Sequence, residues 1–163
     1  MYLLSIDPGP VQSAAVITTA NGDAAPHAVG KLPNHELVYL LPGLEFDHCA
    51  IEMVASYGMP VGKSVFETCV WIGRLVAAVA PRCDPRKVYR KDVKMHLCGN
   101  MRAKDSNIRQ ALIDLYPATG GGALPAIGIK QQPGPLYGFS KDLWAALGVA
   151  HAARAHWSEL EIF

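Results

Sequence analysis

Three acidic residues occur in apolar segments of the sequence, where acidic residues are uncommon. Asp7 closes an apolar run just before a Pro-Gly pair, Glu52 lies in the middle of another apolar run, and Asp142 comes at the start of an alanine-rich segment. An ionised carboxylate in such surroundings is costly unless it is paired or binds a metal ion. Because few basic residues flank Asp7 or Glu52, a metal ion is the simpler compensation.

Oxygen ligands without a Cys/His cluster favour Mg²⁺ or Mn²⁺ over zinc. Two such ions, ~4 Å apart, can activate a water molecule and stabilise both oxygens of an in-line phosphoryl displacement. The acids need not be close in sequence, provided that they meet at adjacent strand ends and at one helix N-terminus. Asp7, Glu52 and Asp142 are therefore the candidate metal ligands and catalytic residues.

Each of these acids also has a purely structural interpretation. Asp7 before Pro-Gly is equally typical of a turn, and Glu52 is able to pair with Arg74 or Arg90. Asp142 is the kind of residue that the helix dipole favours in a first turn. Only the combination of the three acids favours a functional site.

The elements that must position these acids follow from the hydrophobic pattern. Short apolar runs bounded by turn residues predict strands, and they are residues 2–6, 13–19, 48–53, 88–89 and a further strand within 25–31. Apolar residues at helical spacing predict helices, and they are residues 35–41, 64–79, 90–97, 105–116 and 141–157. Asn21-Gly22-Asp23 is a turn signal between the second and third strands. Segments 55–63 and 119–137 are rich in Gly and Pro, which predicts loops, the second of them long and mobile.

Strands come first and then alternate with helices, which predicts an α/β fold with a mixed sheet. A length of 163 residues without an internal linker or repeat predicts one domain over 1–163. The four cysteines form no CxxC pair, so a zinc knuckle is not expected. Neither a signal peptide nor an apolar stretch of the ~20 residues of a membrane span is present, and we expect a cytoplasmic protein without membrane contact.

The net charge of +1 gives no global attraction for nucleic acid, so binding requires a local basic patch. Basic residues gather in one stretch, and they are Arg82, Arg86, Lys87, Arg90, Lys91, Lys94, Arg102 and Lys104. Between Arg86 and Lys104 acids are absent apart from Asp92, which favours a phosphate-contacting face. The alternative is an ordinary solvated helix face.

Four segments, taken together, resemble the RuvC-type Holliday-junction resolvases of the ribonuclease H-like nucleases, including phage-encoded relatives. In order along the chain they are Leu4-Ser5-Ile6-Asp7-Pro8-Gly9; Ala50-Ile51-Glu52-Met53-Val54 with the later Gly73-Arg74-Leu75; Val93-Lys94 through Lys104-Asp105 to Ile108-Arg109-Gln110-Ala111-Leu112; and Lys141 to Ala150. The resemblance implies a ribonuclease H-like fold with antiparallel N-terminal strands and helices on both faces of a mixed central sheet. It also implies a bacterial or phage-infected host cell as the setting.

In that family the positions matched by Asp7, Glu52 and Asp142 bind two Mg²⁺ ions that hydrolyse phosphodiesters in branched DNA. A further acidic or histidine ligand usually follows one helical turn after the third acid, and here that position is Ala145. Asp105 is a candidate substitute, although its position favours helix capping, and His151 lies too far along its helix to join Asp142.

The resemblance also implies contacts with the substrate and between subunits. Lysines of the basic stretch lie near the scissile phosphate in the family, which makes Lys94 and Lys104, then Lys91, the candidates here, with Arg102 beside them. Tyr57 or Phe66 matches an aromatic residue that stacks at the junction centre, and the alternative for Phe66 is a partly buried position on the helix that begins near Ser64. Resolvases of this kind act as symmetric dimers, and the helix over 64–79, with Trp71, is a candidate isologous interface.

The leading hypothesis is thus a Mg²⁺- or Mn²⁺-dependent endonuclease for branched DNA such as Holliday junctions. A nuclease for RNA or flaps is a second enzymatic hypothesis. A non-catalytic nucleic-acid-binding module of the same fold is the alternative that Ala145 favours. Half of a sugar-kinase or actin-like ATPase also opens with Asp-x-Gly, but the chain has no second phosphate-binding Asp-Gly hairpin.

Overall fold

The computed structural model describes residues 1–19, 21–22 and 25–160, with side chains described up to residue 155. Asp23, part of the predicted turn, lies outside the described residues. The predicted α/β fold with a mixed central sheet and helices on both of its faces is confirmed. No helix among the described residues is long and apolar enough to cross a lipid bilayer.

The central sheet has five strands in the order β3-β2-β1-β4-β5. The strands are β1 (Tyr2–Asp7), β2 (Gln12–Thr19), β3 (His27–Pro33), β4 (His48–Met53) and β5 (Arg86–Tyr89). β1, β2 and β3 form an antiparallel meander, whereas β4 and β5 run parallel to β1. Leu3 to Ile6 are all buried, because β1 lies at the centre of the sheet and is covered by helices on both faces.

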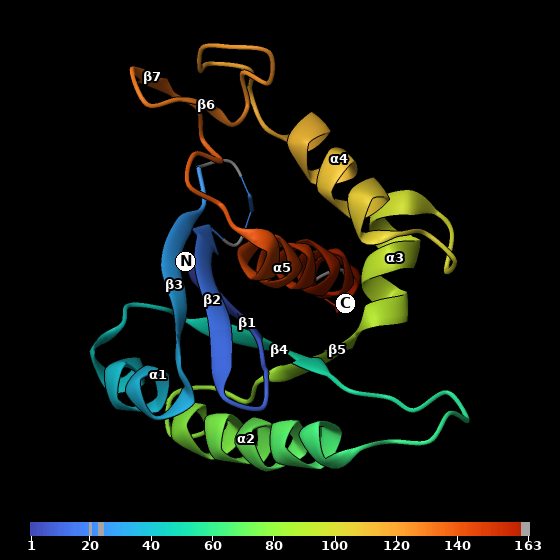
Figure 1. The fold of residues 1–163 in the computed structure, drawn as a ribbon. Coiled ribbons are helices and arrows are strands. Elements are labelled where there is room, and N and C mark those ends of the chain that lie inside the picture. Colours follow the sequence, from blue (N-terminus) through green and yellow to red (C-terminus); the bar gives the residue numbers. More distant parts are fainter. Residues whose placement is uncertain (20, 23–24, 161–163) are drawn as a thin grey trace.

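Two helical layers enclose the sheet (Figure 1). On one face lie α1 (Asn34–Leu40), the short 3₁₀ turn η1 (Leu41–Gly43) and α2 (Lys63–Val79). On the other face lie α3 (Arg90–Cys98), α4 (Asp105–Leu115) and α5 (Lys141–Leu160). These bounds agree with the predicted helices to within a few residues.

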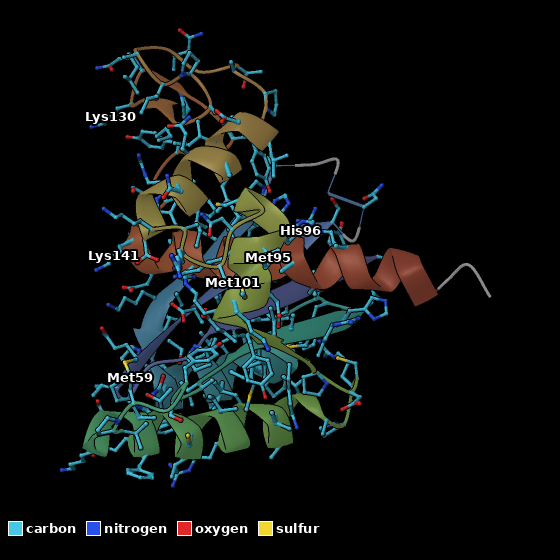
Figure 2. All side chains as sticks on the ribbon, turned by 90° about the vertical axis from the view of Figure 1, so that its right-hand side faces the viewer. Met59, Met95, His96, Met101, Lys130 and Lys141 are labelled. Carbon is cyan, nitrogen blue, oxygen red and sulfur yellow. The ribbon has the colours of Figure 1, made fainter. Side chains whose placement is uncertain are left out.

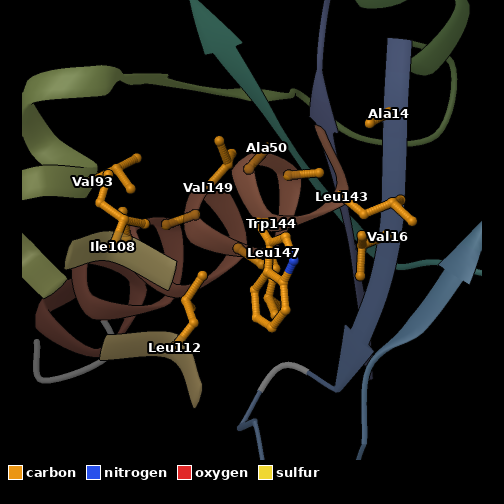
Figure 3. Packing of buried hydrophobic residues seen from close by; sticks show 14 of the residues in the cluster. Ala14, Val16, Ala50, Val93, Ile108, Leu112, Leu143, Trp144, Leu147 and Val149 are labelled. Carbon is orange, nitrogen blue, oxygen red and sulfur yellow. The ribbon is translucent and has the colours of Figure 1, made fainter. Parts of the chain in front are cut away.

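Each layer buries its own apolar cluster against the sheet. Leu37, Ile72 and Leu75 pack on the α1–α2 side with Leu4, Ile6 and Ile51 from the strands. On the other side, α5 contributes Leu143, Trp144, Leu147 and Val149, which meet Val93, Ile108, Leu112 and the strand residues Ala14, Val16 and Ala50 (Figure 3).

Close packing of α3 on α5 depends on Gly148. A Cβ atom at this position would lie 2.9 Å from Cγ1 of Val93 and would touch side chains from both α3 and α4. The small residue therefore sets the spacing at which α3, which carries basic residues, packs against α5, which carries Asp142.

The segment between α4 and α5 is largely a loop, as its Gly/Pro content predicted, but it is internally hydrogen-bonded. It forms an arm with a short hairpin of β6 (Gly128–Ile129) and β7 (Gln132–Pro133), and it extends away from the sheet (Figure 1). Backbone N–H groups of Gly120, Gly128, Gly134 and Leu136 each donate to a carbonyl within the arm. Three of these glycines lie against other backbone atoms of the arm at distances that leave no room for a Cβ atom.

Candidate active site

Asp7 and Glu52 lie side by side at the carboxyl ends of β1 and β4. The parallel register pairs Ile6 with Ile51, so the residue that follows each of them occupies the same edge of the sheet. The two side chains hydrogen-bond to each other. The predicted meeting of these two acids at adjacent strand ends is therefore confirmed.

Burial raises the pKa of both carboxyls, of Asp7 to about 6 and of Glu52 to about 8. For Glu52, the negative charge of Asp7 adds to this effect, whereas the guanidinium of Arg90 opposes it for both acids. Because the two groups interact strongly, the values belong to the pair. At neutral pH the pair therefore holds one proton, mostly on Glu52, which donates to the Asp7 carboxylate.

The turn that follows Asp7 is held by the buried amide side chain of Asn34. Its Nδ2 donates to the carbonyl of Gly9 over 2.9 Å, and its Oδ1 accepts from the Ser13 hydroxyl over 2.6 Å. The backbone N–H of Asn34 also donates to Val11 over 3.0 Å. This network fixes the β1–β2 connection and with it the direction of the Asp7 side chain.

Asp142 lies in the first turn of α5 and approaches Asp7 closely enough for its charge to raise the pKa of Asp7. Its Oδ2 lies 2.6 Å from Nζ of Lys31, a residue of β3 that sequence reasoning missed. Both side chains remain partly exposed, at 37% for Asp142 and 45% for Lys31. Asp142 thus belongs to the same site, but its carboxylate pairs with the ammonium group of Lys31 at the edge of that site.

Arg90, the first residue of α3, lies between two carboxylates. Its Nη2 is 2.6 Å from Oδ1 of Asp105, and its Nη1 is 3.8 Å from Oε2 of Glu52. Of the two arginines considered as partners of Glu52, Arg90 is the one that pairs, while Arg74 stacks over Trp71 on α2. The N-cap of α4 is Lys104 rather than Asp105, the first residue of the helix. The backbone N–H of Lys104 donates to Oδ1 of Asn107 in the first turn.

These groups line a cavity of about 640 Å³ between the strand ends and the starts of α3, α4 and α5. Its lining residues are Asp7, Glu52, Arg90, Asp105, Ser106, Ile108, Arg109, Phe139, Lys141, Asp142, Trp144 and Ala145. Arg109 lies over the Trp144 ring, 5.1 Å from its centroid, and Phe139 packs against the same ring. The methyl group of Ala145 offers no ligand atom to this cavity.

Within the part of the chain that the structure describes, no three Asp, Glu, His or Cys side chains are gathered as a metal-binding group. The reason is visible in the ion pairs, because Lys31 holds Asp142 and Arg90 lies beside Glu52. The chemistry of the donor set nevertheless fits a hard divalent cation. Two buried carboxylates share a proton that such a cation would replace, and a third lies close enough to influence them.

His151 has a structural role, in agreement with its exclusion on sequence grounds. Its Nε2 lies 3.0 Å from the Tyr116 hydroxyl, and burial lowers the pKa of the imidazole to about 3. It therefore stays neutral and joins α5 to the end of α4.

A second hollow of about 410 Å³ adjoins the acidic cavity, since Arg90 lines both. Tyr57, Lys91, Lys94 and Met101 complete its wall, so three of the predicted nucleic-acid contacts come together here. Arg102 and Lys104 are exposed between α3 and α4 but do not line this hollow. Figure 2 looks onto this side of the molecule, with Met101 near the centre of the view, Lys141 to its left and Met59 below.

The outer face of α2 carries apolar side chains that no described element covers. Phe66 and Val70 are 60% and 56% exposed, and Trp71 is half-buried. Phe66 thus lies on the helix surface, while Tyr57, with 59% exposure, lies beside the basic hollow.

No protein-family model and no curated protein sequence matches this chain. Solved structures do match it over nearly the full length. One, of Thermus thermophilus RuvC in complex with a Holliday junction substrate, has a TM-score of 0.67 at 13% identity and covers 99% of this chain and 96% of its own. Another, of Thermus thermophilus RuvC, has a TM-score of 0.66 at 17% identity, with 98% and 97% covered. The chain therefore has the fold of RuvC, and the predicted ribonuclease H-like architecture is confirmed.

Proposed function

We propose that this protein is a metal-dependent endonuclease that hydrolyses phosphodiester bonds in branched DNA such as Holliday junctions. The proposal rests on one observation above all. Two buried carboxylates that share a proton lie at the ends of neighbouring parallel strands, in a fold that is also that of a RuvC solved with a junction substrate. The whole chain, residues 1–163, would act as one nuclease domain.

Asp7, Glu52 and Asp142 are the residues that would hold Mg²⁺, or Mn²⁺. The ion would supply an activated water and stabilise the charge that develops on the phosphate oxygens. The chain's own contribution includes an apolar part of the cavity wall beside these carboxylates, formed by Phe139 and Trp144. The Asp7–Glu52 pair would release its shared proton if a cation bound, and metal affinity would then depend on pH.

Substrate binding is assigned to the basic hollow and its surroundings. Lys91 and Lys94 would contact phosphates next to the acidic cavity, with Lys104 and Arg102 extending the contact along the turn before α4. Tyr57 has an exposed ring beside these lysines and would stack on an unpaired base at the branch point.

A symmetric dimer would place two such sites on the two cut strands of a junction. The uncovered apolar face of α2, with Phe66 and Val70, is the candidate for the isologous contact. A dimer that dissociates on replacement of Val70 by Glu, with the monomer still folded, would support this assignment.

The competing candidate is a binding module that holds junction DNA without cutting it. Ala145 favours it, because the cavity has no ligand at that position and its acids are paired with Arg90 and Lys31. A nuclease for RNA or flaps would differ from the proposed branched-DNA endonuclease only in the substrate that it cuts.

Cleavage of a labelled four-way junction tests the proposal. The protein is incubated with Mg²⁺ or Mn²⁺ beside Asp7→Asn, Glu52→Gln and a matched control, Asp114→Asn. Asp114 is an exposed acid of α4 whose Oδ1 accepts a hydrogen bond from Gln110 over 2.8 Å. Loss of a metal ligand should slow cleavage by ~100-fold or more, since even outer-shell partners cost 10–100-fold. Binding without cleavage under both metals would favour the binding module, and duplex flaps or RNA hybrids in parallel reactions identify the preferred substrate.

A further inference from the structure

Arg90 lies inside the candidate active site, between two of its acids, whereas an arginine that only bound phosphate would not need this position. Its register beside β4 places it just beyond Glu52, since Glu52 pairs with Val88. The side chain is only 28% exposed and lies between the carboxylates of Glu52 and Asp105. The guanidinium is thus a fixed positive charge among the acids.

One end of this guanidinium is satisfied and the other is not. Nη2 donates to Asp105 over 2.6 Å, whereas the buried Nη1, 3.8 Å from Glu52, has no hydrogen-bond partner among the described residues. A buried charged donor without an acceptor is costly, so this N–H is suited to an oxygen that arrives with a ligand. Because Arg90 lines both the acidic cavity and the basic hollow, that oxygen would lie where the two meet.

The charges around the cavity are already almost balanced. Its wall has the four carboxylates of Asp7, Glu52, Asp105 and Asp142, and the cations are Arg90, Arg109 and Lys141, with Lys31 paired to Asp142. Two divalent ions would add four positive charges to a wall whose negative charges are already largely neutralised by cationic side chains. This set of residues can therefore accommodate one divalent ion.

The carboxylates available as ligands also indicate one metal ion. Arg90 engages Asp105 and Lys31 engages Asp142, each over 2.6 Å, and Ala145 supplies no oxygen, so Asp7 and the shared Glu52 are the carboxylates most open to a cation. These carboxylates, with water and substrate oxygens, complete the shell of one hard ion, whereas a second ion would have to displace Lys31 or Arg90 from its acid.

We propose that the site binds one divalent ion per chain and that the guanidinium of Arg90 takes the place of a second ion, with Nη1 donating to an oxygen of the bound phosphodiester. Asp105 is then a positioning residue that anchors the guanidinium. The inference rests on the proposed function for the identity of its substrate, but the number of bound ions can be measured without cleavage.

The test counts Mn²⁺ by isothermal titration and by electron paramagnetic resonance at pH 8.5, with wild type, Arg90→Gln, Arg90→Lys and Arg82→Gln. Wild type should bind one ion. Arg90→Gln should bind a second ion or bind the first at least tenfold more tightly, whereas Arg90→Lys, which keeps the charge, should stay at one. Arg82 contacts backbone carbonyls of Pro42 and Leu44 far from the site, so its replacement should leave the count unchanged.

Two ions in wild type would overturn the inference, as would no bound Mn²⁺ in any of these proteins. An unchanged count and affinity in Arg90→Gln, or a second ion in Arg90→Lys, would do the same. If Arg90→Gln fails to fold by circular dichroism, the counts for wild type and Arg90→Lys still decide. A protein that never cuts DNA but shows the expected counts would refute the proposed nuclease and leave this inference standing.

Discussion

The Glu52 carboxyl donates a hydrogen bond to the Asp7 carboxylate, and the two residues lie at the same edge of the sheet although 44 positions of sequence separate them. The contact follows from the parallel pairing of β1 with β4, which places Ile6 opposite Ile51. Without a cation, a shared proton is what keeps two buried acids together.

This proton predicts a loss of stability as pH rises. Burial raises the folded pKa of Glu52 to about 8, above its ordinary value, so the folded protein binds a proton that the unfolded chain releases. The stabilisation is complete at low pH and is lost as pH rises through that value. The lowered pKa of His151 acts in the opposite sense, but only below its ordinary value of ~6.5.

Between pH 6.5 and 8.5 the effect of Glu52 should therefore dominate, and the Tm of the protein in EDTA should fall. Thermal unfolding followed by circular dichroism measures this, and Glu52→Gln should flatten the slope. Mn²⁺ should raise Tm most at the upper end of the range, where it no longer competes with the proton. The same slope in Glu52→Gln as in wild type would contradict this assignment.

The Lys31–Asp142 pair predicts a variant that binds metal better than wild type. Lys31→Met removes the cation that lies 2.6 Å from Asp142 and frees this carboxylate for a metal ion. Stability should change by less than ~1 kcal/mol, because both side chains are partly exposed. Isothermal titration with Mn²⁺ should show tighter binding by severalfold.

The matched control is Lys63→Met, which breaks the exposed pair of Lys63 with Glu67 on α2. It should leave Mn²⁺ affinity unchanged. If both variants altered the affinity equally, net charge rather than the release of Asp142 would be the cause.

Two helical glycines should respond to alanine in opposite directions. Gly73 on α2 has open space around it, so Gly73→Ala should stabilise the protein by ~0.5–1 kcal/mol through helix propensity. At Gly148 the new methyl would lie 2.9 Å from Val93, and the overpacking should cost ~1–3 kcal/mol.

Urea unfolding measures both free energies. The double variant Val93→Ala with Gly148→Ala should recover part of the loss, because it removes the side chain that the new methyl meets. A stabilising Gly148→Ala would mean that α3 and α5 are not held at the spacing described.

Much of this fold could be predicted because its signals are local. Short apolar runs ending in turn residues identify β1, β2 and β4, and the order of strands and helices then places Asp7 beside Glu52. The acid in the first turn of α5 follows from helical spacing in the same way.

The missed features depend on packing between distant segments. Lys31 reaches Asp142 only because β3 forms the edge of the meander, and Asp105 meets Arg90 only because α4 packs near the start of α3. The short hairpin and the internal hydrogen bonds of the arm between α4 and α5 were missed for a related reason. Glycine and proline usually mark irregular chain, but here the small size of glycine allows backbones to approach and to hydrogen-bond.

The packing of α5 across β1, β2 and β4 also has a consequence for synthesis. Asp7 and Glu52 leave the ribosome early, but Asp142 and the helix that carries it follow only after some ninety further residues. Contacts over such separations form late in folding, since closing long loops costs entropy before the contact is made. An incomplete nascent chain therefore has Asp7 and Glu52 without the assembled cavity.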